Sequence, residues 1–264
     1  MTRPLLSKIW PIVSTVIYGL CCTASMLLLG NPAKAADLNL ARTAIVSSVD
    51  RVGNLTTHSG QIIRLNNIAL LLEATAAHQD SLFWLINQTV GKSLRVTGAK
   101  PKQDRLQRWI GDVFVGDTWL QGDLISMGLA FVVPDASQPQ SLNALIARES
   151  YARHNRLGIW DSPEAPVASP ATAHQFIGTY RIVTGRIIDA SRVKTRVYLN
   201  FGDDYRQDFT VRIDGRLRHQ IDRSGDPPEN WDNRFVEVRG LLLQENGPLI
   251  QLESQYHMRR IKSP

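Results

Sequence analysis

Residues 60–73 read GQIIRLNNIALLLE, and this stretch decides the fold of the first half of the chain. Ile62 to Leu65 is apolar apart from Arg64, which predicts a short β-strand. A charge inside an otherwise buried run is costly unless it is paired or faces a pocket. Two interpretations therefore stay open. Either Arg64 lies on the solvated face of a half-buried strand, or its planar guanidinium group is aimed at a phosphate.

The sequence around this stretch predicts a small barrel. A turn at residues 58–60 joins two short strands into a β-meander, and helical spacing of apolar residues begins at residue 74. Strands are expected over 42–50, 54–57, 61–65, 94–97 and 109–115, and helices over 74–88, over 120–127 and from a cap at Ser141 onward. Short strands wrapped by helices in this way predict a closed β-barrel with helices on the outside.

The second half of the chain is richer in strands. They are expected over 180–189, 196–201, 208–213, 235–241 and 249–252, with a short helix over 217–224. Alternation along two of these strands predicts a shared inner face made of Val197, Leu199, Phe201, Phe209, Val211 and Ile213. A second barrel is therefore expected after the first.

The outer face of this second barrel carries a candidate binding surface. Arg196, Tyr198 and Arg212 share that face, with Phe235 and Arg239 as expected neighbours. A basic sheet face with an aromatic residue can hold single-stranded nucleic acid by stacking and phosphate contact. An ordinary solvated sheet face with one tyrosine is the alternative.

The N-terminal segment precedes both barrels. It begins with Arg3 and Lys8, continues with a nearly apolar run over 9–29, and offers small residues for cleavage at 33–35. This pattern predicts that residues 1–35 are a secretory signal peptide, which would place the protein in the periplasm or outside the cell. An uncleaved membrane anchor is the alternative, and only then is a membrane an expected partner.

Removal of this segment changes the charge and the redox chemistry of the chain. Both cysteines, Cys21 and Cys22, lie within it, so a packed core without disulfides must hold the remainder together. Three of the 30 Lys+Arg and none of the 24 Asp+Glu are lost, which leaves a net charge of +3. This excess is compatible with a polyanion partner but far below that of a dedicated nucleic-acid binder.

Several motifs follow one another in the first half. A strand ending in Arg64-Leu65 is followed by a helix, by DRLQR at 104–108, by LISMGLAFVV at 124–133 and by LGIW at 157–160. In this order they resemble the staphylococcal nuclease (thermonuclease) family. The resemblance implies an OB-fold barrel and, in active members, calcium-dependent hydrolysis of DNA and RNA phosphodiesters.

The chain departs from the active members of that family at the acidic positions. Where those members carry Asp-Gly-Asp-Thr, residues 51–54 read RVGN, with Asp50 adjacent. The metal-binding aspartate of the next motif is replaced by Ala69. The position of the general-base glutamate holds Leu72, and Glu73 follows one residue late. Calcium prefers six to eight oxygen ligands, so no metal site is expected unless the loop rearranges.

The two transition-state arginines of the family do have counterparts, Arg64 and Arg108. The resemblance therefore implies that Arg64, Arg108 and Glu73 are the candidate catalytic residues. Loss of a general base typically costs about 10² to 10⁴ in rate. Surface ion pairing, with Asp104 as the partner, is the alternative role of the two arginines.

The second half resembles a C-terminal extension found on some exported thermonuclease-like proteins. The stretches that carry this resemblance are YLNFG at 198–202, DFTV at 208–211, VRG at 238–240 and NGPLI at 246–250. The expected fold class is mainly β with flanking helices (α+β). A nuclease-type OB-fold barrel over 37–160 is followed by a linker over 161–175 and an OB-like β-barrel over 176–262.

Three functional hypotheses remain. The first is an exported, catalytically impaired thermonuclease-like protein, without a cofactor, that binds single-stranded nucleic acid or another polyanion. The second is an active nuclease that uses calcium with Glu73 and Asp50 in rearranged positions. The third is a structural or partner-binding protein of the cell envelope. The sequence does not indicate an oligomeric state.

Overall fold

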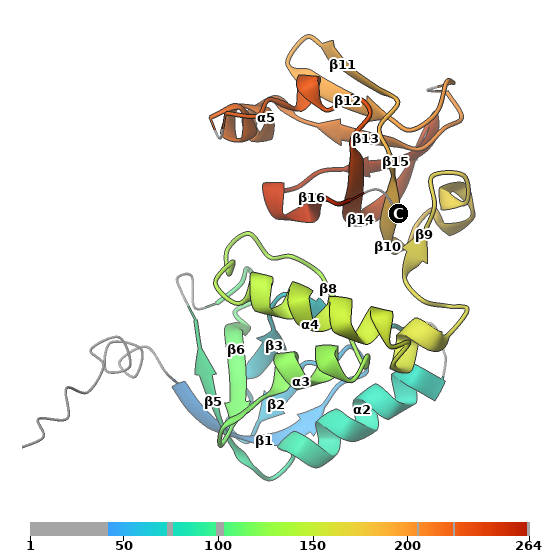
Figure 1. Ribbon diagram of the computed structural model, residues 1–264. Coiled ribbons are helices and arrows are strands. Elements are labelled where there is room, and N and C mark those ends of the chain that lie inside the picture. Colours follow the sequence, from blue (N-terminus) through green and yellow to red (C-terminus); the bar gives the residue numbers. More distant parts are fainter. Residues whose placement is uncertain (1–41, 73–75, 99–102, 205, 224, 263–264) are drawn as a thin grey trace, which may run out of the picture.

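Two β-barrels follow one another along the chain, the first in the lower half of Figure 1 and the second in the upper half. The structure, a computed structural model, describes residues 42–72, 76–98, 103–204, 206–223 and 225–262. The predicted signal peptide lies outside the described residues. Within them, no helix combines the length and the apolar character needed to span a membrane.

The first barrel has the strand order of an OB-fold. Its strands are β1 (Arg42–Val49), β2 (Leu55–Thr57), β3 (Ile62–Leu65), β5 (Ser93–Thr97) and β6 (Trp109–Val115). Strand β1 pairs antiparallel with both β2 and β5, β5 pairs with β6, and the parallel pairing of β3 with β6 closes the barrel. Helix α2 (Ala76–Thr89) connects β3 to β5. The predicted mainly β fold with an OB-type first barrel is confirmed.

Helices cover the side of this barrel that faces the second domain (Figure 1). They are α3 (Leu120–Ser126) and α4 (Leu142–His154), and the short strands β4 (Ile68–Ala69), β7 (Thr118–Trp119) and β8 (Phe131–Val132) and the 3₁₀ helix η1 (Gly158–Asp161) lie around them. Ser141 occupies the N-cap position of α4, but the prediction that its side chain caps the helix is wrong. Its hydroxyl donates instead to the Asp112 carboxylate at 2.9 Å.

The second barrel repeats the same topology. Its main elements are β10 (Tyr180–Arg186), β11 (Asp189–Val193), β12 (Arg196–Asn200), β13 (Thr210–Ile213), α5 (Gly215–Asp222), β14 (Phe235–Glu245) and β15 (Gly247–Gln251). Strand β10 pairs with β14, β11 pairs with β12, and β13 runs parallel to β15. If β10 and β11 are taken as one bent first strand, both domains have the same strand order, with a helix between the third and fourth strands.

The single strand predicted over 180–189 is therefore divided in two. Ile187 donates its N–H to the carbonyl of Arg234, whereas the next residue, Ile188, donates to the carbonyl of Asn200 in β12, the neighbour on the other edge of the strand. Because the first strand of a closed barrel must pair with two different neighbours, it bends where its partners change.

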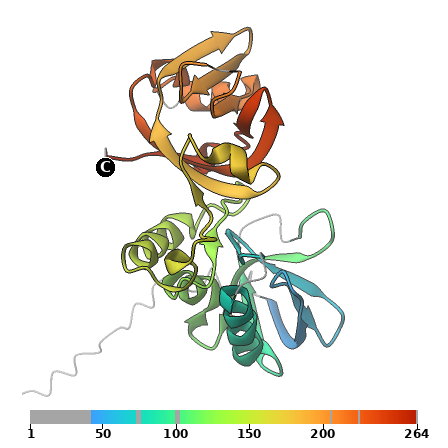
Figure 2. The same cartoon turned by 90° about the vertical axis from the view of Figure 1, so that its right-hand side faces the viewer.

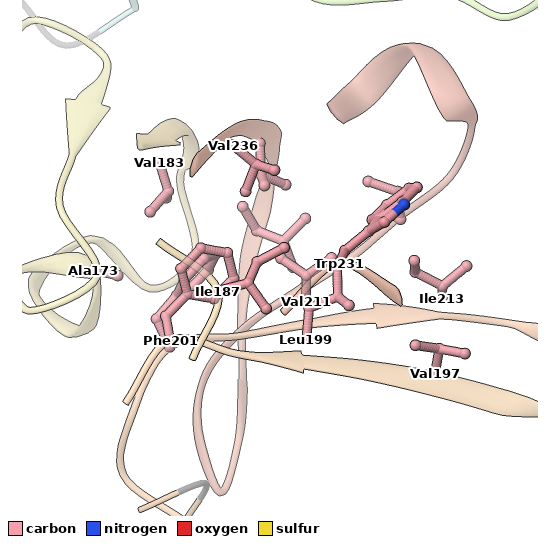
Figure 3. Close-up of a cluster of buried hydrophobic side chains, with 14 of the residues drawn as sticks. Ala173, Val183, Ile187, Val197, Leu199, Phe201, Val211, Ile213, Trp231 and Val236 are labelled. Carbon is pink, nitrogen blue, oxygen red and sulfur yellow. The ribbon is translucent and has the colours of Figure 1, made fainter. Parts of the chain in front are cut away.

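Figure 3 shows the core of this second barrel. Val197, Leu199, Phe201, Phe209, Val211 and Ile213 are all buried, as the alternation predicted. Trp231, next to the 3₁₀ helix η3 (Pro228–Asn230), closes one end of the cluster. Each Å² of apolar surface buried contributes about 25 cal/mol to the stability of the folded state. A core of this kind can therefore stabilise a chain whose described part contains no disulfide.

The segment between the barrels has structure of its own. Within the predicted linker, β9 (Val167–Ala168) pairs parallel with β10, and the 3₁₀ helix η2 (Ala173–Phe176) follows. Ala173 is fully buried in the core of the second barrel. At the far end of the chain, η4 (Gln255–His257) leads into β16 (Met258–Arg260), which pairs with β14. The segment over 161–175 is thus packed against the second barrel and is not a free spacer.

A buried cluster of charged side chains joins the two barrels. Arg239 of β14 is only 2% exposed and pairs with Glu149 of α4, which is fully buried. Arg239 Nη2 donates to Glu237 Oε1 at 2.7 Å, and Arg239 Nη1 donates to the carbonyl of Val132 at 2.9 Å. Arg153 of α4 donates to Glu237 at 2.6 Å. Charges buried to this degree are tolerated only when each is compensated.

Replacing Arg239 by methionine tests how much this cluster matters. The variant leaves Glu149 buried without its cation, so the free energy of unfolding is expected to fall by about 3–5 kcal/mol in urea denaturation. Arg260→Met is the matched control, since Arg260 is 64% exposed and pairs with Asp226 at 3.0 Å. The control is expected to change stability by about 0–1 kcal/mol. Equal effects of the two substitutions would contradict this interpretation.

The loss of unfolding free energy caused by Arg239→Met should also depend on pH, which gives the same prediction a second measurement. Burial by itself raises the pKa of Glu237, but the neighbouring arginines, Arg239 first, hold that pKa well below its usual value. A lowered carboxylate pKa contributes stability above the unfolded-state pKa, and this stability is lost as the pH falls. The free energies of unfolding of wild type and Arg239→Met should therefore differ most near neutral pH. This difference should become smaller below about pH 4.

Candidate functional site

A pocket of about 170 Å³ opens on the first barrel beside β3. Its wall is formed by Val52, Gly53, Asn54, Arg64, Leu65, Ile68, Ala69, Leu70 and Arg108. Both arginines selected from the sequence thus share one pocket with Gly53 and Ala69, two positions at which active nucleases of the resembled family carry an aspartate. The motif positions, which are scattered along the chain, meet in space.

Strand alternation positions Arg64 on this wall. Its neighbours in β3, Ile63 and Leu65, point into the barrel core and are at most 5% exposed, so Arg64 faces outward. The parallel pairing of β3 with β6 brings the segment that contains Arg108 alongside Arg64. The outward position of Arg64 agrees with the first interpretation, and the side chain also lines a pocket, whereas its contact with a phosphate stays a prediction.

A tight turn positions Arg108. Asp104 Oδ1 accepts the backbone N–H of Leu106 at 2.9 Å and that of Arg108 at 3.1 Å. Gln107 within this turn has φ of 59°, a left-handed conformation that a glycine adopts at lower cost. Active members of the resembled family carry glycine at this position, and the turn keeps its shape here without one.

The two guanidinium groups converge on one carboxylate oxygen. Arg108 Nη2 lies 2.7 Å from Asp104 Oδ2, and Arg64 Nε lies 3.7 Å from the same atom. Arg64 Nη2 also pairs with Asp135 Oδ2 at 2.5 Å. Arg64 Nε is buried and makes no hydrogen bond. The pocket therefore holds two cations that already bind anionic oxygens supplied by the chain.

Both carboxylates are held in their charged form. Burial raises the pKa of Asp104, but hydrogen bonds from Arg108 and from the backbone lower it overall. Burial likewise raises the pKa of Asp135, and hydrogen bonds from Ser137 together with the charge of Arg64 lower it overall. At neutral pH these two aspartates therefore compete with any external anion for the arginines.

The described residues of the pocket do not fit a calcium ion. None of the wall residues is a carboxylate, although calcium binds several carboxylate oxygens in its protein sites. The nearby Asp50 does not line the pocket and instead holds its wall in place, because Asp50 Oδ1 accepts the N–H of Val52 at 3.0 Å and that of Asn54 at 2.8 Å. Across the described part of the chain, no group of three or more His, Cys, Asp or Glu residues is placed to hold a metal.

Glu73, the remaining candidate acid, lies outside the described residues, so its role stays a prediction. Leu70 and Leu71 are buried, but Leu72 is 42% exposed. Leu72 is not among the residues of the pocket wall.

The structure shows where the candidate surface of the second barrel lies. Tyr198 and Arg212 are directly opposite each other on β12 and β13, and Arg196 follows one row away. Arg196 pairs with Asp214 at 3.2 Å, and Arg212 Nη1 pairs with Glu245. The expectation that Arg239 neighbours them is wrong, because the first barrel covers that part of β14 and buries the side chain. Their role in binding nucleic acid stays a prediction.

Asp135 is a site residue that sequence inspection missed. It is 71 residues from Arg64 in the chain, and its only local signal is a turn in which its carboxylate accepts the N–H and hydroxyl of Ser137. Such turns are common in loops and do not identify a distant partner. Only the fold brings the two side chains together.

The first barrel thus has an OB-fold and carries both arginines of the family's motifs beside one pocket. Residues 77–162 match the family model described as staphylococcal nuclease homologue. The resemblance inferred from the motifs is therefore confirmed over these residues. The match begins at α2 and includes Arg108, while β1 to β4 precede it. No curated protein matches the chain.

The donor set of the pocket predicts that calcium does not stabilise the protein. A ligand that binds only the folded state raises the unfolding temperature with its concentration. We expect thermal unfolding in millimolar CaCl₂ to match unfolding in EDTA, with NaCl added to equal ionic strength as the control. A saturable rise in the unfolding temperature that Glu73→Gln abolishes would show a metal site that includes that residue.

Proposed function

We propose that the first barrel binds a phosphate of single-stranded nucleic acid, or of another polyanion, through Arg64 and Arg108 without hydrolysing it. The observation that carries this proposal is the convergence of both guanidinium groups on Asp104 Oδ2. An anionic oxygen already sits between the two cations. A phosphate oxygen in that position would satisfy the same donors, including Arg64 Nε, which has no hydrogen bond at present.

The same contacts imply that the affinity is modest. A phosphate must displace or share the contacts of Asp104 and Asp135, and both carboxylates stay charged at neutral pH. The free energy gained from the new ion pairs with the phosphate is therefore partly offset by the loss of the existing pairs with the aspartates. Binding is also expected to weaken with salt, because the release of condensed counterions gains less free energy as the salt concentration rises.

The pocket supplies no group that could activate water among its described residues. Two guanidinium groups can bind a phosphate and stabilise its charge, but they cannot accept a proton because they stay protonated. Hydrolysis by this family type also uses a metal, for which the described wall offers no carboxylate. Binding without turnover is the function that this set of side chains favours.

Removal of the competing carboxylates gives the sharpest test of binding. Asp104→Asn keeps the oxygen that accepts the backbone N–H groups but loses the charge, so we expect it to tighten binding of a fluorescent oligothymidylate several-fold at low salt. Arg64→Gln and Arg108→Gln should abolish binding. Arg105→Gln is the matched control, since Arg105 is an exposed arginine of the same loop outside the pocket.

Two results would contradict the proposal. One is that the wild type and Asp104→Asn both fail to bind the oligonucleotide at low salt. The other is cleavage of DNA or RNA that requires a divalent metal, stops with chelator and is lost in both Glu73→Gln and Arg108→Ala. The second result would establish the active nuclease in place of a binding protein.

We also propose that the protein is exported, on the basis of the apolar run and cleavage pattern in residues 1–35. The measurement is the mass of the chain recovered from the periplasm or culture medium of an expressing bacterium. A chain that begins at Ala36 is expected. A full-length chain that stays in the membrane fraction would identify an anchor instead.

A further inference from the structure

A groove of about 480 Å³ lies on the outer face of the second barrel, away from the arginine pocket. It is lined by Asp189, Ser191, Val193, Tyr198, Asn200, Thr210, Glu245, Asn246 and Leu249. Its size falls within the range of about 300–1,000 Å³ that is common for small-molecule sites. The second half of the chain therefore has a candidate site of its own.

The strand register arranges the floor of this groove in two rows. Asp189, Asn200, Thr210 and Leu249 lie side by side across β11, β12, β13 and β15. Ser191 and Tyr198 are paired in the next row, on β11 and β12. The turn between β14 and β15 adds Glu245 and Asn246 as a wall. Rigid strands thus present carboxylate, amide and hydroxyl groups around one tyrosine.

The polar groups of the floor are linked in a chain of hydrogen bonds. Thr210 Oγ1 donates to Asn200 Oδ1 at 3.2 Å, and Asn200 Nδ2 donates to Asp189 Oδ2 at 3.1 Å. The Ser191 hydroxyl donates to the same carboxylate. These contacts fix the orientations of the groups, while each oxygen retains further acceptor capacity. The groove is therefore organised before any ligand arrives.

The charges on this face do not favour a polyanion. Its two arginines, Arg196 and Arg212, are engaged by Asp214 and Glu245, and Arg212 Nε also donates to Gln251. The groove wall itself contains two carboxylates and no cation. A phosphate backbone would have to approach these carboxylates without a free arginine to offset them.

The same contacts do not favour a cationic ligand. The Glu245 carboxylate is paired with Arg212, and the Asp189 carboxylate accepts hydrogen bonds from Ser191 and Asn200. A lysine or arginine of a partner would compete with Arg212 for Glu245 and with Ser191 and Asn200 for Asp189. A neutral ligand with many hydroxyl groups can instead donate to the remaining lone pairs and accept from amide and hydroxyl donors.

We propose that this groove binds a neutral oligosaccharide. The apolar face of a sugar ring can stack on the Tyr198 ring, while its hydroxyl groups bond to Asp189, Asn200 and Asn246 on either side. Val193, which lines the groove and is 53% exposed, gives it an apolar surface that suits the C–H groups of the ring. This inference is independent of phosphate binding by the first barrel.

Calorimetric titration of the full chain with cellohexaose, chitohexaose and maltohexaose tests the proposal. At least one of these glycans is expected to bind, and Tyr198→Ala should weaken its Kd about tenfold through loss of the stacking surface. Asp189→Asn, which keeps the side-chain shape, should weaken it several-fold. Tyr151→Ala is the matched control, because Tyr151 is a 61% exposed tyrosine on α4, and it should leave the Kd unchanged.

The proposal fails if none of the three glycans binds at millimolar concentration. It also fails if Tyr198→Ala and Asp189→Asn both retain the wild-type Kd and unfold at the wild-type temperature. Oligothymidylate and oligolysine complete the test. Binding of either one that is lost in Tyr198→Ala, in the absence of glycan binding, would assign the groove to a charged ligand.

Discussion

The buried Arg239 cluster is the contact on which the arrangement of this molecule depends. Arg239 of the second barrel contacts Glu149 of α4 and the carbonyl of Val132 in β8. Strand β8 pairs with β4, whose residues Ile68 and Ala69 line the arginine pocket. Arg239 of the second barrel is thus linked to the wall of the arginine pocket in the first barrel by two contacts, one with Val132 and one between β8 and β4. Because unpaired buried charges are costly, a shift of one barrel that broke these pairs while they stayed buried would be unfavourable.

Two barrels with one topology present different chemistry on their outer faces. The first pairs Arg64 and Arg108 with chain carboxylates in a small pocket. The second displays amides, hydroxyls and a tyrosine in a larger groove. In both, strand alternation fills the interior with apolar side chains and leaves the outer positions free to vary. The fold therefore fixes where a site can form, and the outward side chains fix what it can bind.

The first pocket keeps the two arginines of the family's motifs, whereas the metal-binding acids are replaced. The positions that hold metal-binding acids in active nucleases are Gly53 and Ala69 here, and Asp104 and Asp135 approach the arginines from other loops. The carboxylates near this pocket therefore contact the arginines, and none of them lines the described wall where a metal would bind. Such a site is suited to exchange one bound anion for another and is poorly suited to activate water.

The sequence by itself determined the elements and the cores, because apolar alternation and turn residues act within a few positions of the chain. It also identified Arg64 and Arg108, whose motifs keep their order. Only the tertiary structure decided the partners of the charges. Arg239 was expected on an open face and lies buried against Glu149, 90 residues away, and Asp135 was not foreseen at all. Ion pairs between distant segments leave no periodic signal in a sequence, since their geometry exists only after the barrels have closed and packed together.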